Sequence, residues 1–106
     1  MIPQRDGDVV LEKNIEQKSR RLVERSGGWL VKLTWINGIP DRLVLAPPGI
    51  IYFVEFKKPG VKARPLQSAR IRRIKRMGFQ AYVVDNYAEF VLLFERFQSH
   101  ANEWNI

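Results

Sequence analysis

The chain has 106 residues, the length of one compact domain, and 45% of them are hydrophobic, which is enough to form a core. It has no Cys and a single His, His100, which excludes disulfides and cysteine nucleophiles and argues against His-rich metal sites and Ser–His pairs. No apolar run reaches the roughly 20 residues of a membrane span, and the N-terminus lacks the apolar stretch of a signal peptide. We therefore expect a single domain over residues 1–106, located in the cytoplasm.

The positive charge of the chain is unevenly distributed. The net charge is +7, and the segment from Lys57 to Arg76 contains nine Lys or Arg and no Asp or Glu. A local cationic field of this kind suits a polyanion, most commonly nucleic acid. A well-solvated or ribosomal-type basic surface would have the same composition, so charge alone does not predict chemistry.

The first predicted element is a helix over Leu11–Arg25, which contains no Pro or Gly and ends before Gly27-Gly28. The later predicted elements are strands over Trp29–Trp35, Arg42–Ala46 and Ile50–Lys57, a helix over Pro65–Met77, a strand over Gln80–Val84 and a helix from Tyr87 to about Phe97. The third strand is apolar on both faces, which predicts a central strand covered on both sides. This α-β-β-β-α-β-α order predicts an α/β domain with a mixed sheet flanked by helices. Tight turns allow the first three strands to run antiparallel, and a helical crossover makes the fourth parallel to its neighbour.

Charged residues stand at two adjoining strand ends. Alternation puts Glu55 and Lys57 on one face at the end of the third strand, and Asp41 precedes the second strand. In a hairpin these two ends meet, so Asp41 and Glu55 should be close neighbours. Two such carboxylates repel unless a cation bridges them, and Mg²⁺ prefers oxygen ligands of this kind. Lys57 could then orient an attacking water or stabilise charge on a phosphate.

A structural interpretation of the same residues is open. Glu55 and Lys57 could form a buried ion pair, with Asp41 capping a turn, and an Asp followed by Glu-x-Lys often occurs by chance. The position of these residues at adjoining strand ends, directly before the basic segment, favours chemistry.

The segment GIPDRLVLAPPGIIYFVEFKKPG resembles the core of the VRR-Nuc nucleases, a family of the PD-(D/E)XK superfamily. The motifs that carry the resemblance are Gly38-Ile39-Pro40-Asp41, Val54-Glu55-Phe56-Lys57, Arg64-Pro65-Leu66-Gln67, Gly78, and EKNIEQ in the first helix ahead of Gly27-Gly28. The resemblance extends from about residue 11 to 95. It implies a restriction-endonuclease-like core and a stand-alone enzyme of the phage or viral type.

The resemblance also implies roles for individual residues. Asp41, Glu55 and the carbonyl of Phe56 would bind Mg²⁺ or Mn²⁺, and Lys57 would be the catalytic lysine. Gln67 resembles the additional motif glutamine, which would position the lysine, the water or a phosphate. Its alternative interpretation is a surface glutamine.

The first helix should supply one more acid to the metal site, and two candidates stand one turn apart. Glu12 faces nearer the apolar side, whereas Glu16 lies at its border. Because the helix must reach back across the sheet, we expect Glu16 to be the ligand. Either glutamate could instead be solvated or paired with Lys13 or Arg20.

The resemblance implies a Mg²⁺- or Mn²⁺-dependent DNA endonuclease that selects branched DNA, such as four-way junctions. A junction offers two strands to cut, which suits a homodimer. Aromatic side chains could furnish the interface, but we expect more of them to lie in the core. The predicted contacts to the DNA backbone are Arg42, Lys58, Lys62, Arg64, Arg70 and Arg73. The alternative is a non-catalytic basic nucleic-acid-binding module on the same fold, which would have no need for the acidic set.

Overall fold

The computed structural model of the protein describes residues 4–34 and 36–104, and describes side chains over 12–34 and 36–101. The elements are α1 (Gln4–Arg25), β1 (Trp29–Lys32), β2 (Arg42–Ala46), β3 (Ile50–Phe56), α2 (Pro65–Arg76), β4 (Ala81–Val84) and α3 (Tyr87–Trp104). This order and the mixed sheet confirm the predicted fold class.

Both outer helices are longer than predicted. α1 begins at Gln4, ahead of the expected start at Leu11, because Gly7 does not interrupt it. α3 continues past Phe97 to Trp104, and no Pro or Gly stands in that extension. A single Gly weakens a helix by only about 1 kcal/mol relative to Ala, which a long helix can accommodate.

The first strand is shorter than predicted. β1 ends at Lys32, and one further hydrogen bond, from the Leu33 N–H to the Asp41 carbonyl at 2.7 Å, continues the pairing toward β2. The predicted end of this strand, Trp35, lies outside the described residues.

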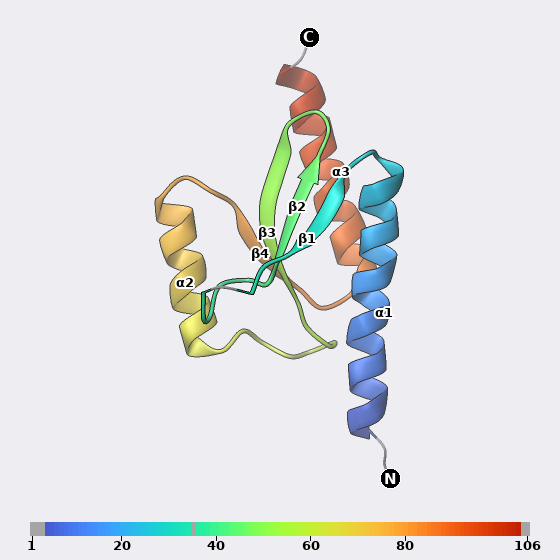
Figure 1. Cartoon of the computed structure of the whole chain (residues 1–106), viewed down its shortest axis with the longest axis vertical. Coiled ribbons are helices and arrows are strands. Elements are labelled where there is room, and N and C mark those ends of the chain that lie inside the picture. Colours follow the sequence, from blue (N-terminus) through green and yellow to red (C-terminus); the bar gives the residue numbers. More distant parts are fainter. Residues whose placement is uncertain (1–3, 35, 105–106) are drawn as a thin grey trace.

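The four strands form one sheet in the order β1-β2-β3-β4. β1 pairs with β2 and β2 with β3 in antiparallel fashion, whereas β3 and β4 are parallel. The turn at Pro47-Pro48-Gly49 closes the β2–β3 hairpin, in which Val44 lies opposite Tyr52. Figure 1 shows this hairpin in the middle of the molecule, with β3 between β2 and β4.

The core lies on the face of the sheet that carries Tyr52. The Tyr52 ring stacks on Phe97 of α3 with ring centroids 4.4 Å apart, and Phe90 and Phe94 are fully buried in the same cluster. α1 and α3 pack against each other over this face, and α2 stands across the sheet from α1 (Figure 1). Phe90 and Phe94 therefore belong to the core, whereas Trp29 is exposed.

The opposite face of the sheet is only partly covered. α2 contacts β4, and Ile51 of β3 is 48% exposed. The expectation that β3 is covered on both sides is therefore met fully on one face and partly on the other, where Ile51 is exposed but Glu55 is buried.

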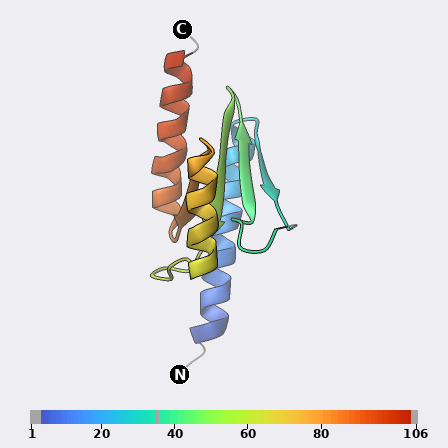
Figure 2. The same cartoon turned by 90° about the vertical axis from the view of Figure 1, so that its left-hand side faces the viewer.

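The molecule is elongated, and α1 begins and α3 ends at opposite ends of it (Figures 1 and 2). The start of β2 and the end of β3 point toward the end at which α1 begins (Figure 1). Within the described residues, no helix has both the length and the apolar character needed to cross a membrane.

Candidate active site

The β2–β3 hairpin brings Asp41 and Glu55 together. Its register pairs Arg42 with Val54, so the residue before β2 lies beside the residue after Val54. The Asp41 backbone N–H donates a hydrogen bond to Glu55 Oε1 at 3.0 Å. The two carboxylates are therefore neighbours, as the predicted hairpin required.

Glu55 and Lys57 form a largely buried pair at the end of β3. Lys57 Nζ lies 3.8 Å from Glu55 Oε2, and the two side chains are 13% and 11% exposed. This distance indicates an ion pair and is too long for a direct hydrogen bond. The ammonium can therefore reach a water or a phosphate oxygen placed beside it.

Burial is the main cause that raises the pKa of Glu55 above its ordinary value of 4.5, and the charge of Asp41 raises it further. The hydrogen bond from the Asp41 N–H and the charge of Lys57 act in the opposite direction, and the charge of Glu12 adds a smaller increase. Ionisation of Glu55 in the folded protein is therefore unfavourable, and a bound cation would stabilise the ionised carboxylate.

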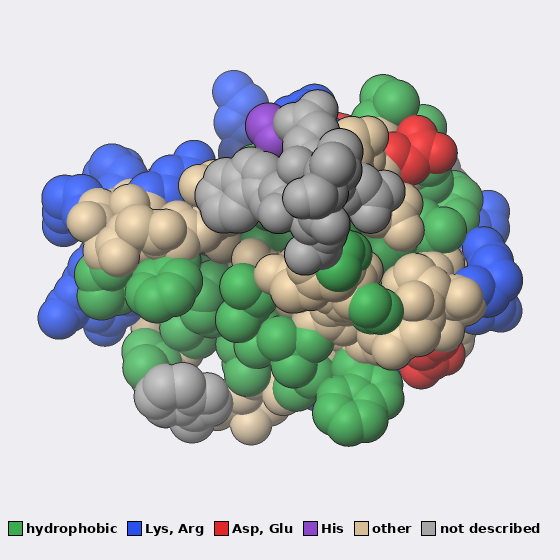
Figure 3. All heavy atoms as spheres, turned by 90° about the horizontal axis from the view of Figure 1, so that it is seen from above, with side chains coloured by type: hydrophobic (Ala, Val, Ile, Leu, Met, Phe, Trp, Pro, Cys, Tyr) green, Lys and Arg blue, Asp and Glu red, His purple; other side chains and the backbone are tan. Residues whose placement is uncertain are grey.

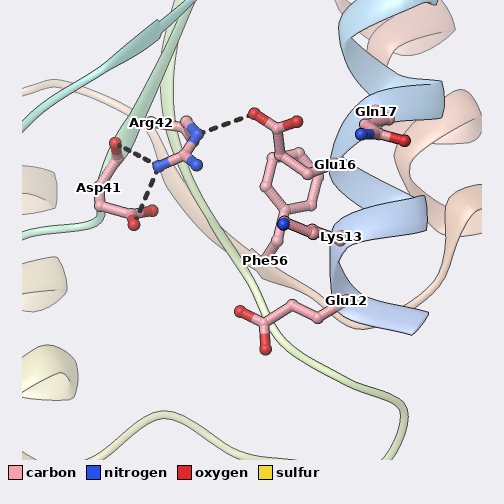
Figure 4. Close-up of a pocket in the computed structure, with 7 residues that line it drawn as sticks. All are labelled: Glu12, Lys13, Glu16, Gln17, Asp41, Arg42 and Phe56. Carbon is pink, nitrogen blue, oxygen red and sulfur yellow. Dashed lines mark hydrogen bonds and ion pairs between the residues drawn. The ribbon is translucent and has the colours of Figure 1, made fainter. Parts of the chain in front are cut away.

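Arg42 joins the site to α1. Its Nε donates to Glu16 Oε2 at 3.0 Å, and its Nη1 lies 2.9 Å from Asp41 Oδ2 and donates to the Asp41 carbonyl at 3.2 Å. Figure 4 shows the guanidinium between the two carboxylates. The contact of Arg42 with DNA stays a prediction. In the structure the N–H groups of Arg42 are directed at Glu16 and Asp41.

The two glutamates of α1 have different surroundings. Glu16 Oε2 is bound by both Arg20 and Arg42, as the ion-pair alternative for Arg20 predicted. Burial alone would raise the pKa of Glu16, but these two arginines outweigh it and lower the pKa below 4.5. Glu12 is half-buried one turn away and is the α1 acid whose charge reaches Glu55. The structure thus leaves both candidates for the third ligand in place.

A pocket of about 270 Å³ lies between α1 and the strand ends (Figure 4), and neither Glu55 nor Lys57 is among the residues that line it. The pocket is lined by Glu12, Lys13, Glu16, Gln17, Asp41, Arg42 and Phe56. Over residues 4–34 and 36–104, no group of three or more His, Cys, Asp or Glu is arranged to hold a metal ion. Asp41 and Glu55 are joined by the hydrogen bond from the Asp41 N–H, and Arg42 lies between Asp41 and Glu16.

This donor set fits a hard divalent cation. Mg²⁺ is commonly held by one or two carboxylates together with water and substrate phosphates. Asp41 and Glu55 supply two carboxylates, and β3 ends beside them with the Phe56 carbonyl. The protein engages Asp41 Oδ2 and Glu55 Oε1, which leaves one carboxylate oxygen of each without a described hydrogen bond.

Comparison with known proteins places this chain in a family. No family model matches the chain. A curated relative, "Putative nuclease p44" of Acyrthosiphon pisum secondary endosymbiont phage 1, is 38% identical over 80 residues, which cover 74% of this chain and 86% of the relative. A solved structure described as a VRR_NUC domain has a TM-score of 0.73 and 31% identity, and the match covers 79% of this chain and 94% of that one. The chain belongs to the VRR-Nuc nuclease family. The phage source of the relative confirms the predicted phage type.

Gln67 of this VRR-Nuc chain has a local role in the structure. It lies in the first turn of α2, where its Oε1 accepts a hydrogen bond from the Arg64 backbone N–H at 3.1 Å. This contact caps the helix, as in a capping box. Its predicted role beside Lys57 stays a prediction.

α2 is fixed to the loop that precedes Asp41. Arg70 Nε donates to the Asn37 carbonyl at 3.3 Å, and Leu66 packs over Gly38. Gly38 has φ +83°, and a Cβ there would lie 2.5 Å from Leu66 Cγ, so only glycine fits. The basic helix of this VRR-Nuc domain is thereby held beside the proposed site.

One positioning residue escaped sequence reasoning. Asp85, directly after β4, accepts a hydrogen bond from the Gly60 N–H at 2.9 Å and so fixes the loop that follows Lys57 and Lys58. An acid directly after a short strand is a common turn signal, and nothing in the sequence connects it with a glycine 25 residues earlier.

Opposite pKa shifts predict opposite effects of two isosteric substitutions on the metal-free protein. Because the pKa of Glu55 is raised, its ionisation costs stability above about pH 4.5, so Glu55→Gln should be more stable than the wild type at pH 7. Because the pKa of Glu16 is lowered, Glu16→Gln should be less stable at pH 7, by about 1–3 kcal/mol. Both differences should shrink as the pH falls below 4.5.

The measurement is the free energy of unfolding by urea at several pH values in the presence of EDTA. Each variant serves as the control for the other, because both remove one carboxylate charge from the same VRR-Nuc site. A shift of both variants in the same direction at pH 7 would contradict these assignments.

Proposed function

We propose that this VRR-Nuc protein is a divalent-metal-dependent DNA endonuclease whose catalytic residues are Asp41, Glu55 and Lys57. The observation that supports this most strongly is the buried strand end where the Lys57 ammonium stands 3.8 Å from Glu55, which is hydrogen-bonded by Asp41. A merely structural ion pair would not need a second carboxylate beside it, since that raises the cost of ionising Glu55.

Asp41 and Glu55 would hold Mg²⁺ or Mn²⁺, with the Phe56 carbonyl and Glu16 as further ligands. The bound ion would polarise a phosphodiester and lower the pKa of a water molecule. Lys57 would orient that water or stabilise the negative charge that develops on the phosphate. The hairpin holds these groups rigidly, so little reorganisation accompanies the reaction.

The basic residues that follow β3 would bind the DNA backbone. Figure 3 shows Lys and Arg side chains gathered over α2, at the left of the view. The exposed cations of this helix are Arg72, Arg73, Lys75 and Arg76, and Lys58, Lys62, Arg64 and Arg70 continue the charge toward the site. Contacts of this kind fix position and affinity without reading sequence.

The proposed substrate is branched DNA, such as a four-way junction, and the proposed assembly is a homodimer. A two-fold dimer would present two equivalent sites to the two strands that must be cut. The proposed location is the cytoplasm of the cell in which the gene is expressed.

The proposal is tested with a panel of labelled four-way junction, flap and linear duplex DNA of matched sequence. We expect cleavage with Mg²⁺ or Mn²⁺ and none with EDTA, and faster cleavage of the junction than of the duplex. Equal cleavage rates on all substrates would contradict the selectivity for branched DNA but not the nuclease activity. DNA binding without cleavage under every metal condition would favour the non-catalytic module.

A substitution on α2 should weaken DNA binding without changing the chemistry. Arg73→Ala is expected to lower the slope of log Kd against log salt by about one, because one phosphate contact is lost. Fluorescence anisotropy at several salt concentrations measures this slope. Arg25→Ala is the matched control, since Arg25 is an exposed cation at the far end of α1. An equal decrease of this slope in both variants would contradict a specific role for α2 in DNA binding.

A further inference from the structure

The Arg42 guanidinium occupies a place between carboxylates where a cation is needed. Its side chain is only 16% exposed, and it meets Glu16 at 3.0 Å and Asp41 at 2.9 Å. Arginine suits such a position because its planar fork can serve two acceptors at once and stays charged at every physiological pH. Without it, the acids at the pocket wall would face one another with less compensation.

The sheet directs Arg42 toward the pocket. Arg42 lies opposite Val54, which is fully buried on the face that α1 and α3 cover. Its side chain therefore points toward α1, where Glu16 stands, and it joins α1 to the start of β2. Asp41, one residue earlier, forms an ion pair with Arg42 through its carboxylate and accepts a hydrogen bond from it through its carbonyl.

A divalent ion at Asp41 and Glu55 would meet this guanidinium. The ion needs carboxylate oxygens, and Arg42 already engages Asp41 Oδ2. The charges of the ion and of Arg42 also repel each other, strongly so in a partly buried pocket. The two cations therefore compete for the same acid.

We propose that Arg42 is a positioning residue that takes the place of the divalent cation in the metal-free protein. It holds Asp41 and Glu16 in position, and it leaves the Asp41 carboxylate, while keeping Glu16, when the metal binds. This inference rests on the proposed function, because it requires a metal at Asp41 and Glu55. Glu16 can serve both proposed roles because Arg42 and Arg20 both bind its Oε2, which would retain the displaced guanidinium, while its Oε1, which has no described hydrogen bond, stays available to the metal.

Arg20 provides an internal control. It binds the same Glu16 oxygen as Arg42, but its Nη1 donates to the Leu30 carbonyl at 2.8 Å. Its described hydrogen bonds and ion pairs include none to Asp41. A substitution of Arg20 removes a guanidinium from Glu16 without removing the competitor at the metal site.

The test is a calorimetric titration of Mn²⁺ into the wild type, Arg42→Gln and Arg20→Gln. We expect Arg42→Gln to bind Mn²⁺ about tenfold more tightly than the wild type, because the competing charge is gone. Arg20→Gln should bind within about threefold of the wild type, because the charge it loses lies farther from Asp41. Both variants should unfold at a lower temperature without metal.

Three results are informative in different ways. Tighter binding by Arg42→Gln supports the proposal, and unchanged or weaker binding overturns it even if this variant is less stable. If the wild type itself binds no divalent ion, the metal dependence of the proposed function fails, and the role of Arg42 fails with it.

A second measurement on the wild type covers the case in which Arg42→Gln does not fold. NMR spectra of protein with ¹⁵N-labelled arginine, recorded during a Mg²⁺ titration, follow the side-chain N–H signals of Arg42 and Arg20. We expect the Arg42 signal to shift and to saturate with metal binding, while the Arg20 signal shifts less. Saturating metal with an unmoved Arg42 signal would overturn the proposal.

Discussion

Lys57→Ala is expected to reduce the rate of DNA cleavage by about 10²–10⁴-fold, because it removes the group that would orient the water or stabilise the phosphate charge. The side chain is 13% exposed and lies against Glu55, so it is already placed at the site. The measurement is single-turnover cleavage of a labelled four-way junction in Mg²⁺ or Mn²⁺.

Lys58→Ala is the matched control for that experiment. Lys58 carries the same charge one residue further along, past the end of β3. Its loss should weaken DNA binding and leave the rate at saturating enzyme within about threefold, as expected for a backbone contact. Equal loss of rate in the two variants would contradict the special role of Lys57.

Phe90→Ala is expected to destabilise the fold by about 3–5 kcal/mol, because it leaves a cavity in the centre of the core. Phe90 is fully buried, and its ring packs against Phe56, at the end of β3, and against Phe94, with ring centroids 5.6 and 6.2 Å away. Urea denaturation measures the loss. Leu92→Ala, two residues away on the exposed side of α3, should change stability by at most about 0.5 kcal/mol.

A loss below about 1 kcal/mol for Phe90→Ala would contradict the placement of α3 over the sheet. The same substitution should also lower activity, because unfolded molecules do not cleave DNA. Phe56, which contacts Phe90, belongs to both the core and the pocket wall.

The adjoining strand ends could be predicted from the sequence because they depend on local signals. The Pro47-Pro48-Gly49 turn closes two short apolar strands, and a tight hairpin leaves little freedom in register. Once that register is set, Asp41 must lie beside Glu55, and Lys57 must follow directly after the same strand. This part of the site needed no information from distant segments.

The partner of Arg42 could not be predicted in the same way. An arginine at the start of a strand in a strongly basic chain is typical of a DNA contact. The structure turns it instead toward Glu16, which lies 26 residues earlier in the chain. That pairing depends on how α1 crosses the sheet, and the sequence alone does not specify the crossing.

Which of Glu12 and Glu16 approaches the metal site also depends on how α1 crosses the sheet. The two acids stand one turn apart, so a small rotation or shift of α1 decides which of them approaches Glu55. In the structure Glu16 is bound by two arginines, whereas the charge of Glu12 acts on Glu55. Helical spacing narrowed the candidates to two but could not separate them.

The most direct test of the proposed metal site is a Mn²⁺ titration by calorimetry of the wild type and Asp41→Asn, with junction cleavage measured on the same samples. Asn keeps the size of the side chain and the backbone N–H that binds Glu55, and removes only the charge. We predict saturable binding by the wild type, and at least about tenfold weaker binding, or 1.4 kcal/mol, with loss of cleavage for Asp41→Asn. Equal metal affinity and equal cleavage in the two proteins would contradict the site.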